Sequence, residues 1–236
     1  RHTRYGTVTG VQTCALPICK SVEARIERRV VASASAVVVA SLEAADYLRT
    51  TYAQHADKVR VVSNGFDGEW SDLDAQPSPS GPLRLVHTGS FSYSHPRRSP
   101  QVLFAALERL QREDEGWAKR INVVLVGALS ADEEAAAAPL QHSGMVHIAG
   151  VVERDESLAI QQTAHVLLVV DHVRPWTSTN IPSKVYEYLA LRRPILSLGG
   201  SGAVGRLVAE LEAGMHVLGD DVEAVCAALL PWTRAG

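Results

Sequence analysis

Residues suited to binding a nucleotide gather at the start of a predicted helix, in the block 179–190. The block reads Thr-Asn-Ile-Pro-Ser-Lys-Val-Tyr-Glu-Tyr-Leu-Ala and follows the apolar run 166–170, which predicts a buried strand. A helix N-terminus presents unpaired N–H groups and a positive dipole end, so the backbone at Ser183 suits a phosphate. Lys184 adds a positive charge, and Glu187 lies on the same helical face. A carboxylate there can accept hydrogen bonds from a ribose diol.

The same block has a plainer interpretation. Lys184 and Glu187 can form a surface ion pair that contributes only a few tenths of a kcal/mol. Pro182 and Ser183 can begin an ordinary helix, because proline suits the first turn. A single helix start after a strand does not decide between the two interpretations.

A second cationic segment follows the predicted strand 83–88. Gly89 ends that strand, and the loop after it contains Arg97 and Arg98. A backbone without a side chain can approach a diphosphate closely, and the planar arginine fork matches phosphate oxygens. The alternative is that Arg97 and Arg98 are a solvated pair in a loop.

Short apolar segments alternate with helical patterns of about ten residues along most of the chain. Strands are predicted at 36–40, 59–62, 83–88, 122–126, 146–149, 166–170, 194–198 and 215–218, and helices at 21–32, 42–52, 100–111, 131–140, 156–164, 183–192, 203–213 and 221–230. This alternation predicts an α/β fold with a doubly wound parallel sheet, which binds ligands beyond the carboxyl ends of its strands.

Changes in composition divide the chain. Residues 1–19 lack a clean period and include GVQTCALPI, which resembles translated adapter sequence, so we interpret them as a non-native segment. A native N-terminal arm is the alternative. The Pro-rich segment 76–82 predicts a linker between a short region, 20–75, and a larger domain, 83–236.

Composition excludes several classes of protein. The 236 residues carry a net charge of −3 with both signs interspersed, and no basic stripe suggests a nucleic-acid partner. No apolar run is long enough to span a membrane. Cys14, Cys19 and Cys226 have neither metal-ligand nor disulfide spacing, so a reducing cytoplasm is the default expectation.

These pieces, in this order, resemble the retaining, nucleotide-sugar-dependent glycosyltransferases of the family-four type, which have the two-domain GT-B fold. Segments 35–41 and 58–67 resemble the end of that family's N-terminal domain. The donor domain is matched by His87-Thr-Gly-Ser, Arg98-Ser-Pro and segments 103–107, 124–127, 146–151, 182–190 and 193–196. The resemblance covers most of the chain from residue 20 to residue 230.

The resemblance implies roles for the candidate residues that meet the nucleotide. Glu187 would bind the ribose hydroxyls. The diphosphate would be held by Lys184 at the helix start of Ser183, and by Arg97 or Arg98 near Gly89. The backbone at Gly150 and Val151 would meet the base.

This sequence departs from the family at two points: Ser99 and Pro100 follow Arg98 where the family often has a lysine, and the position of a family glutamate near the donor sugar differs. The family often has a glutamate eight residues before the ribose-binding one, and that position is Thr179 here. Thr179 or Asn180 would therefore contact the sugar. No metal or other cofactor is expected, because cationic side chains and a helix dipole can stabilise a leaving diphosphate, and residues 171–187 contain no Asp-x-Asp pair.

The resemblance also implies an activity. The full-length protein would transfer a sugar from a nucleoside diphosphate sugar to a glycan or lipid-linked acceptor, in the cytoplasm or at the inner face of the membrane. Residues 20–75 would be the last strands and helices of a truncated acceptor domain, so this fragment is expected to bind donor without transferring it. The alternatives are a nucleotide-sugar-binding module without turnover and a sugar-nucleotide epimerase with the GT-B fold.

Overall fold

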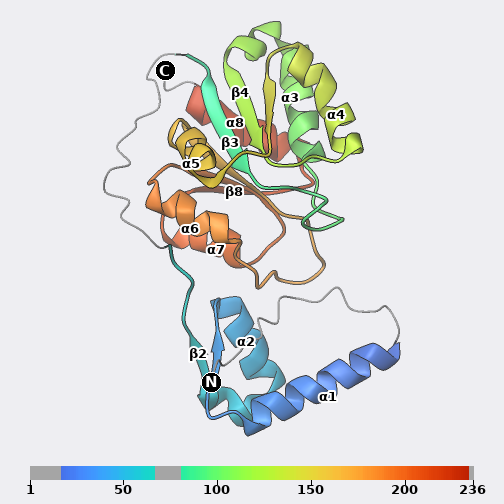
Figure 1. Cartoon of the computed structure of the whole chain (residues 1–236), viewed down its shortest axis with the longest axis vertical. Helices are drawn as coiled ribbons and strands as arrows, with labels where there is room; N and C mark the ends of the chain where they lie inside the picture. Colours follow the sequence, from blue (N-terminus) through green and yellow to red (C-terminus); the bar gives the residue numbers. More distant parts are fainter. Residues whose placement is uncertain (1–16, 67–80, 234–236) are drawn as a thin grey trace.

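The computed structural model describes residues 17–66 and 81–233, which form two parallel β-sheets of unequal size (Figure 1). Residues 17–66 hold a two-stranded sheet, and residues 81–233 hold a six-stranded one. Most of the segment 1–19 and most of the predicted linker 76–82 lie outside the described residues. No helix of the described part is long and apolar enough to cross a membrane.

The large sheet is doubly wound, as the alternation of strands and helices predicts. Its strands are β3 (Leu83–Thr88), β4 (Ile121–Val126), β5 (Val146–Gly150), β6 (Val166–Val170), β7 (Ile195–Gly199) and β8 (Gly214–Leu218). Their order is β5-β4-β3-β6-β7-β8, and every pair is parallel. The chain winds outward from β3 to β5, returns to β6 beside β3, and winds outward again in the other direction. The winding therefore reverses between β3 and β6.

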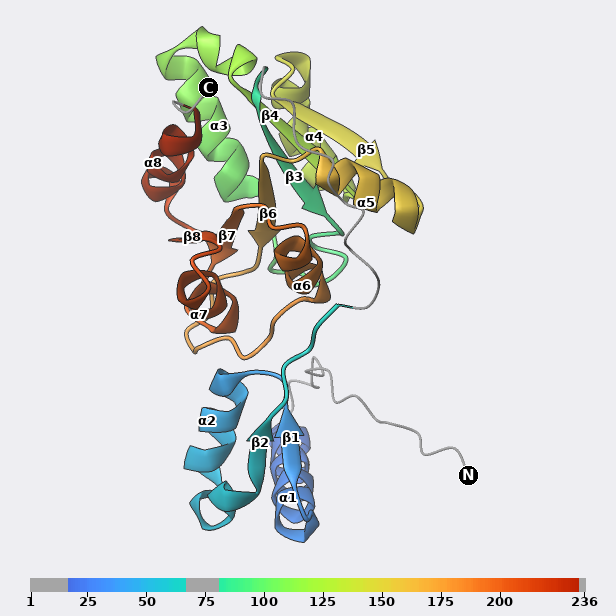
Figure 2. The same cartoon turned by 90° about the vertical axis from the view of Figure 1, so that its left-hand side faces the viewer.

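Helices cover both faces of this sheet, and each face has its own apolar core. The helices are α3 (Gln101–Glu113), α4 (Ala131–His142), α5 (Arg154–Gln162), α6 (Ser183–Ala190), α7 (Ala203–Glu210) and α8 (Val222–Thr233). One core packs α3, α4 and α8 on the sheet through residues such as Leu107, Leu140 and Leu229. The other packs α6 and α7 through Tyr188 and Val208, with α5 at its margin. Figure 2 shows α3 and α8 side by side, in agreement with their contacts.

The smaller part pairs β1 (Val37–Val39) with β2 (Val59–Val61) in parallel. Helices α1 (Pro17–Ser33) and α2 (Leu42–Thr51) and a short 3-10 helix, η1 (Ala53–Lys58), complete it. Two strands are fewer than a stable sheet usually needs, because they bury little apolar surface.

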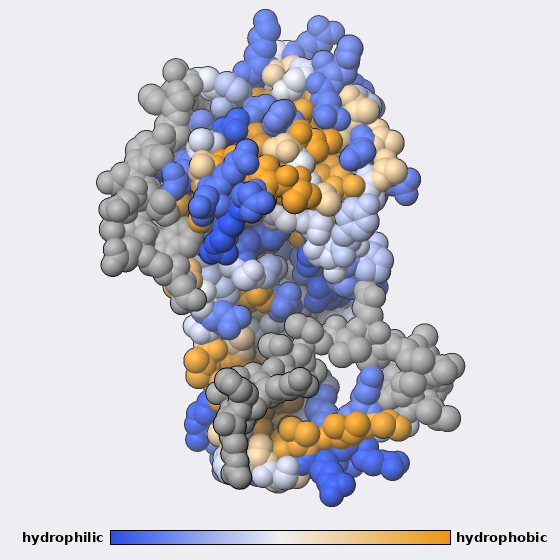
Figure 3. All heavy atoms as spheres, in the orientation of Figure 1, coloured by the Kyte–Doolittle hydropathy of each residue, from blue (hydrophilic) through white to orange (hydrophobic). Residues whose placement is uncertain are grey.

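Helix α1 leaves an apolar stripe open to solvent. Val22, Ile26 and Val30 recur every four residues and are 47%, 58% and 57% exposed. Figure 3 shows this stripe along α1. Val38, in the centre of β1, is also exposed. A parallel sheet is normally covered on both faces. The exposed apolar residues of α1 and β1 therefore form a surface that another segment would normally cover.

The element boundaries differ from the predicted ones in local details. Helix α1 begins at Pro17, so the end of the segment 1–19 is continuous with it. The 3-10 helix η2 (Glu115–Lys119) was not predicted; the Asp114 carboxylate starts it by accepting a hydrogen bond from Gly116 N at 2.8 Å. Helix α6 ends two residues before the predicted 192, because Arg192 adopts a left-handed φ of 53°.

Candidate functional site

The reversal of winding between β3 and β6 opens a place for a ligand at the carboxyl ends of these strands. Leu85 and Val86 of β3 pair with Val166 and Leu167 of β6. The chain that leaves β3 contains Gly89, and the chain that leaves β6 leads to α6. The two segments that the sequence singled out, 83–98 in one and 179–190 in the other, are therefore brought to the same edge of the sheet.

Gly89 shapes the floor of this edge. Its N–H donates to the carbonyl of Val126 at 2.7 Å, and its φ of 97° favours glycine. A Cβ at Gly89 would lie 2.9 Å from Lys184 Nζ. Gly127, which ends β4, is equally constrained, because a Cβ there would lie 2.8 Å from the carbonyl of Gly89. A side chain at Gly89 would therefore collide with the lysine ammonium group, and one at Gly127 would collide with the backbone of Gly89.

Lys184 turns its ammonium group inward across the top of β3. Nζ donates to the carbonyl oxygen of Thr88 and lies 3.5 Å from His87 Nε2. Burial lowers the pKa of Lys184 to about 7; the charge of Arg98 adds to this effect, and Glu187 partly opposes it. None of the ion pairs within 17–66 and 81–233 includes Lys184. A largely buried ammonium group without a carboxylate partner favours an anionic ligand.

The groups beneath Lys184 are neutral and tightly packed. His87 is buried and stacks on Phe91 with ring centroids 4.3 Å apart. Burial, and then the Lys184 charge, keep the pKa of His87 well below its usual range. The Tyr188 hydroxyl bonds to the N–H and the side chain of Thr88 at 3.1 and 3.0 Å, which links α6 to the end of β3. This layer fixes the positions of Lys184 and Gly89.

Arg98 is held in an ion-pair network and is not a solvated loop residue. Its guanidinium group lies 3.2 Å from Asp171 Oδ1, and the two side chains are only 12% and 11% exposed. Arg174 donates to both oxygens of the same carboxylate. Burial by itself would raise the pKa of Asp171, but Arg174, a His172 backbone hydrogen bond and Arg98 lower it overall. Arg97 is exposed on the same loop.

Two histidines lie beside this network. His95 and His172 stack with ring centroids 3.8 Å apart. Burial, together with the charge of Arg174, lowers the pKa of His172 to about 4, so it is neutral at pH 7. The cluster around Asp171 therefore keeps an excess of positive charge from Arg97, Arg98 and Arg174. Among the described residues, no group of three or more His, Cys, Asp or Glu can hold a metal ion.

Glu187 faces a pocket of about 380 Å³ between α5, α6 and the end of β3. The pocket is lined by Thr88, Gly89, Val152, Arg154, Ser157, Leu158, Gln161, Lys184 and Glu187. Glu187 Oε1 lies 3.2 Å from the Arg154 guanidinium group, and the side chains are 22% and 70% exposed. Glu187 therefore pairs with Arg154, whereas the surface-pair interpretation required Lys184.

The remaining candidate residues lie around the rim. Gly150 has a left-handed φ of 74° and accepts a hydrogen bond from Gly127 N at 2.7 Å. Val151 follows it and is 78% exposed. Thr179 and Asn180 are exposed in the loop before α6, where the carbonyl of Thr179 accepts a hydrogen bond from Ser41 Oγ at 2.7 Å. Neither lines the pocket beside Glu187.

Ser183 is the first residue of α6, and no side chain caps this helix at Pro182. The N–H of Val185 donates to the carbonyl of Pro182 at 3.0 Å, so the N–H groups that the N-terminus of α6 presents beside Lys184 are those of the residues before Val185.

Several residues of the site were not singled out from the sequence. Asp171 directly follows β6, and a polar residue at the carboxyl end of a buried strand was the available signal. Arg154 and Gln161 had no comparable signal, because they matter only through the position of α5 on β3, which places them in the same pocket as residues of α6. The smaller part contacts the large domain at α7, where Glu43 of α2 forms an ion pair with Arg206.

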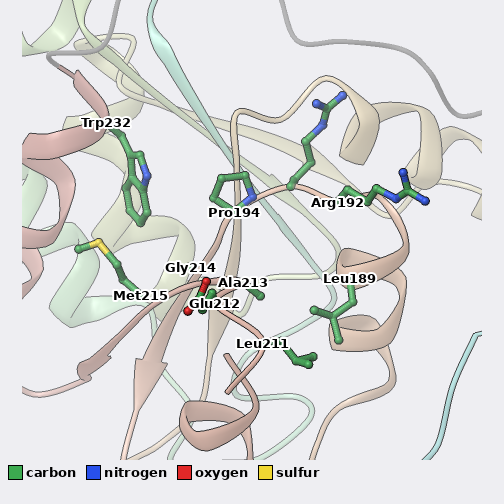
Figure 4. Close-up of a pocket in the computed structure, with 10 residues that line it drawn as sticks. Leu189, Arg192, Pro194, Leu211, Glu212, Ala213, Gly214, Met215 and Trp232 are labelled. Atoms are coloured by element: carbon green, nitrogen blue, oxygen red, sulfur yellow. The ribbon is translucent and has the colours of Figure 1, made fainter. Parts of the chain in front are cut away.

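Another pocket, of about 550 Å³, lies at the opposite edge of the sheet. Its lining includes Arg192, Pro194, Leu211, Gly214 and Trp232, and Figure 4 shows the Trp232 ring near Met215. Helices α6 and α7 end here, so their negative dipole ends disfavour an anion. It contains none of the candidate site residues and lies at the amino ends of β7 and β8, away from the switch point.

A scan against protein-family models found no match, and neither did a search of curated protein sequences. Solved structures do match. A glycosyltransferase from Rickettsia africae has a TM-score of 0.63 at 15% identity, over 85% of this chain and 53% of that one. Sucrose-phosphate synthase from Thermosynechococcus elongatus has a TM-score of 0.61 at 18% identity, over 94% of this chain and 57% of that one.

A third neighbour was solved with ligands. HepE from Anabaena, in complex with UDP and glucose, has a TM-score of 0.56 at 16% identity, over 91% of this chain and 60% of that one. The chain thus spans between half and two thirds of the length of these neighbours. Identities this low establish the fold alone. The two parallel sheets, the six-stranded switch topology and these neighbours together give this chain the fold of the GT-B glycosyltransferases.

Proposed function

We propose that this chain is the donor-binding part of a retaining glycosyltransferase that uses a nucleoside diphosphate sugar. The observation that carries the proposal is the convergence of Gly89, Lys184 and Glu187 on one pocket at the switch point. An ammonium group without a carboxylate partner suits the diphosphate, and a carboxylate one turn further along α6 suits the ribose diol.

The site would contribute to catalysis by electrostatic stabilisation of the leaving group. When the bond between the sugar and the diphosphate breaks, negative charge develops on the leaving phosphate oxygens. Lys184, Arg98 and the uncapped N-terminus of α6 are fixed in a partly desolvated place, where such charges interact more strongly than in water. The buried layer of His87 and Tyr188 holds Lys184 in position, so little reorganisation is needed at the moment of reaction.

The N-terminal part is proposed to belong to the acceptor-binding domain. Its two-stranded sheet is small, and the apolar stripe of Val22, Ile26 and Val30 is exposed. The acceptor is proposed to be a glycan or a lipid-linked glycan, which that domain would hold across from Thr179 and Asn180. A full-length protein that works on such acceptors would act in the cytoplasm or at the inner face of the membrane.

The first test is a titration of the purified chain with UDP-, GDP- and ADP-sugars by calorimetry. We expect one base series to bind, and we expect no sugar transfer to an added acceptor, because this chain spans only 53% and 57% of the length of two glycosyltransferase-fold neighbours that it matches. Lack of binding by all three series would remove the proposed function. Robust transfer by this chain alone would show that residues 20–75 suffice as an acceptor domain and would overturn the fragment interpretation.

Donor binding is expected to need no divalent metal. The reason is that Lys184 and Arg98 already place two cationic groups near the phosphate position. Affinity for the nucleoside diphosphate should therefore be equal in excess chelator and in millimolar Mg²⁺ or Mn²⁺. Binding that a chelator abolishes and a metal restores would contradict this assignment of the diphosphate site.

A binding module without turnover remains the second candidate function. A binding module would give the same titration results as a glycosyltransferase. The two functions are therefore distinguished by an activity assay on a longer protein. If this chain, joined to a complete acceptor domain, binds donor but neither transfers nor hydrolyses it, the binding-module function is favoured.

A further inference from the structure

Gln161 has a buried amide with one end unsatisfied, in the wall of the switch-point pocket. The residue is 2% exposed and lies on the last turn of α5. Its Nε2 is 3.4 Å from Ser157 Oγ, which is a long hydrogen bond. Its Oε1 has no hydrogen-bond partner among the described residues.

The unsatisfied oxygen is unfavourable for the free chain. A buried acceptor without a donor loses its hydrogen bond to water and gains none in return, whereas an apolar side chain of similar shape would avoid this cost. Gln161 shares one face of α5 with Arg154, Ser157 and Leu158, because these positions are separated by three, four and seven residues. All four line the pocket that contains Glu187. A ligand that supplies a donor would recover the lost hydrogen bond.

We propose that Gln161 binds the base of the nucleotide through an N–H group on the edge of that base. The proposal rests on the proposed function. Lys184 and Gly89 mark the phosphate end of the pocket, and Glu187, one turn along α6, takes the ribose. The base would then meet α5, where Gln161 lines the pocket and its unpartnered Oε1 would accept the hydrogen bond. Uracil, guanine and adenine each carry a suitable N–H donor.

The test compares Gln161→Met with Gln162→Met, a matched control because Gln162 is the next residue and does not line the pocket. The probes are the nucleoside diphosphate that the wild type binds and inorganic pyrophosphate. We expect Gln161→Met to lose about tenfold in affinity for the nucleoside diphosphate, which is about 1.4 kcal/mol. Its affinity for pyrophosphate and its melting temperature should not fall. The control should match the wild type in all three.

A second ligand keeps the test independent of whether the variant folds well. Full methylation of the base nitrogen that carries the N–H, which for the adenine amino group means two methyl groups, removes the donor from the ligand. The wild type should lose as much affinity for the methylated nucleotide as Gln161→Met loses for the normal one, and the two losses should not add. Equal binding of both nucleotides by the wild type, or additive losses, would overturn the role of Gln161. Failure of the wild type to bind any nucleotide would instead overturn the proposed function.

Discussion

Replacement of Lys184 by methionine is expected to lower the affinity for a nucleoside diphosphate by about 10- to 150-fold, because a charged hydrogen bond contributes about 1.5–3 kcal/mol. Methionine keeps most of the length and apolar contacts of the side chain while removing the ammonium group. The melting temperature of the free chain should not fall, since the lost group is largely buried and has no carboxylate partner among the described residues. Calorimetric titration and thermal melting measure the two quantities.

The pH dependence gives a second readout of the same prediction. A bound diphosphate favours the ammonium form, so it raises the pKa of Lys184 above its value of about 7 in the free chain. Affinity is then greatest below pH 7 and falls as the pH rises through 7, by at most about tenfold per pH unit. Lys184→Met should lose this dependence.

Lys119→Met is the matched control, because Lys119 is an exposed lysine of η2 that does not line the pocket. It should change neither the affinity nor its dependence on pH. Unchanged affinity in Lys184→Met, or equal losses in both variants, would remove Lys184 from the phosphate site.

Replacement of Glu187 by glutamine is expected to weaken nucleotide binding about tenfold or more, since the ribose diol loses a charged acceptor worth about 1.5–3 kcal/mol. The amide keeps the shape of the side chain but has one acceptor oxygen instead of two. The melting temperature of the free chain should barely move. The partner of Glu187, Arg154, is 70% exposed, and such pairs contribute little to folding.

Arg154→Gln separates the two possible roles of Glu187. If Glu187 serves only to pair with Arg154, both variants should behave alike and leave nucleotide affinity unchanged. If Glu187 binds ribose, only Glu187→Gln should lose affinity for the nucleotide, and neither variant should lose affinity for pyrophosphate. Equal affinities of Glu187→Gln and the wild type for UDP and GDP would take Glu187 out of the site.

Much of the large domain could be predicted from the sequence. Each strand from β3 to β8 was expected within two residues of its observed bounds, because a buried parallel strand reads as a short apolar run between turn residues. The helix that begins at Ser183 was also expected, since proline before it and periodic apolar residues within it are local signals. The short 3-10 helices were missed, because single turns leave little periodicity.

The sequence by itself determined which segments could hold a nucleotide. Glycine at the end of β3 and lysine and glutamate in the first turns of α6 are local features, and the chemistry of their side chains follows from residue type. The sequence did not determine how these segments meet, because the order of strands in a sheet is not contained in their periodicity.

Only the tertiary structure decided which residues form hydrogen bonds and ion pairs with the candidate site residues. Lys184 bonds to Thr88, which is 96 residues away in the chain, because β6 returns to lie beside β3. Glu187 meets Arg154, and Arg98 meets Asp171, for the same reason. The unsatisfied amide of Gln161 is likewise a consequence of packing α5 on β3, since the same residue on an open helix face would bond to water. The residue types therefore determine which chemical groups are present. The reversal of winding at the centre of the sheet brings these groups together in one site.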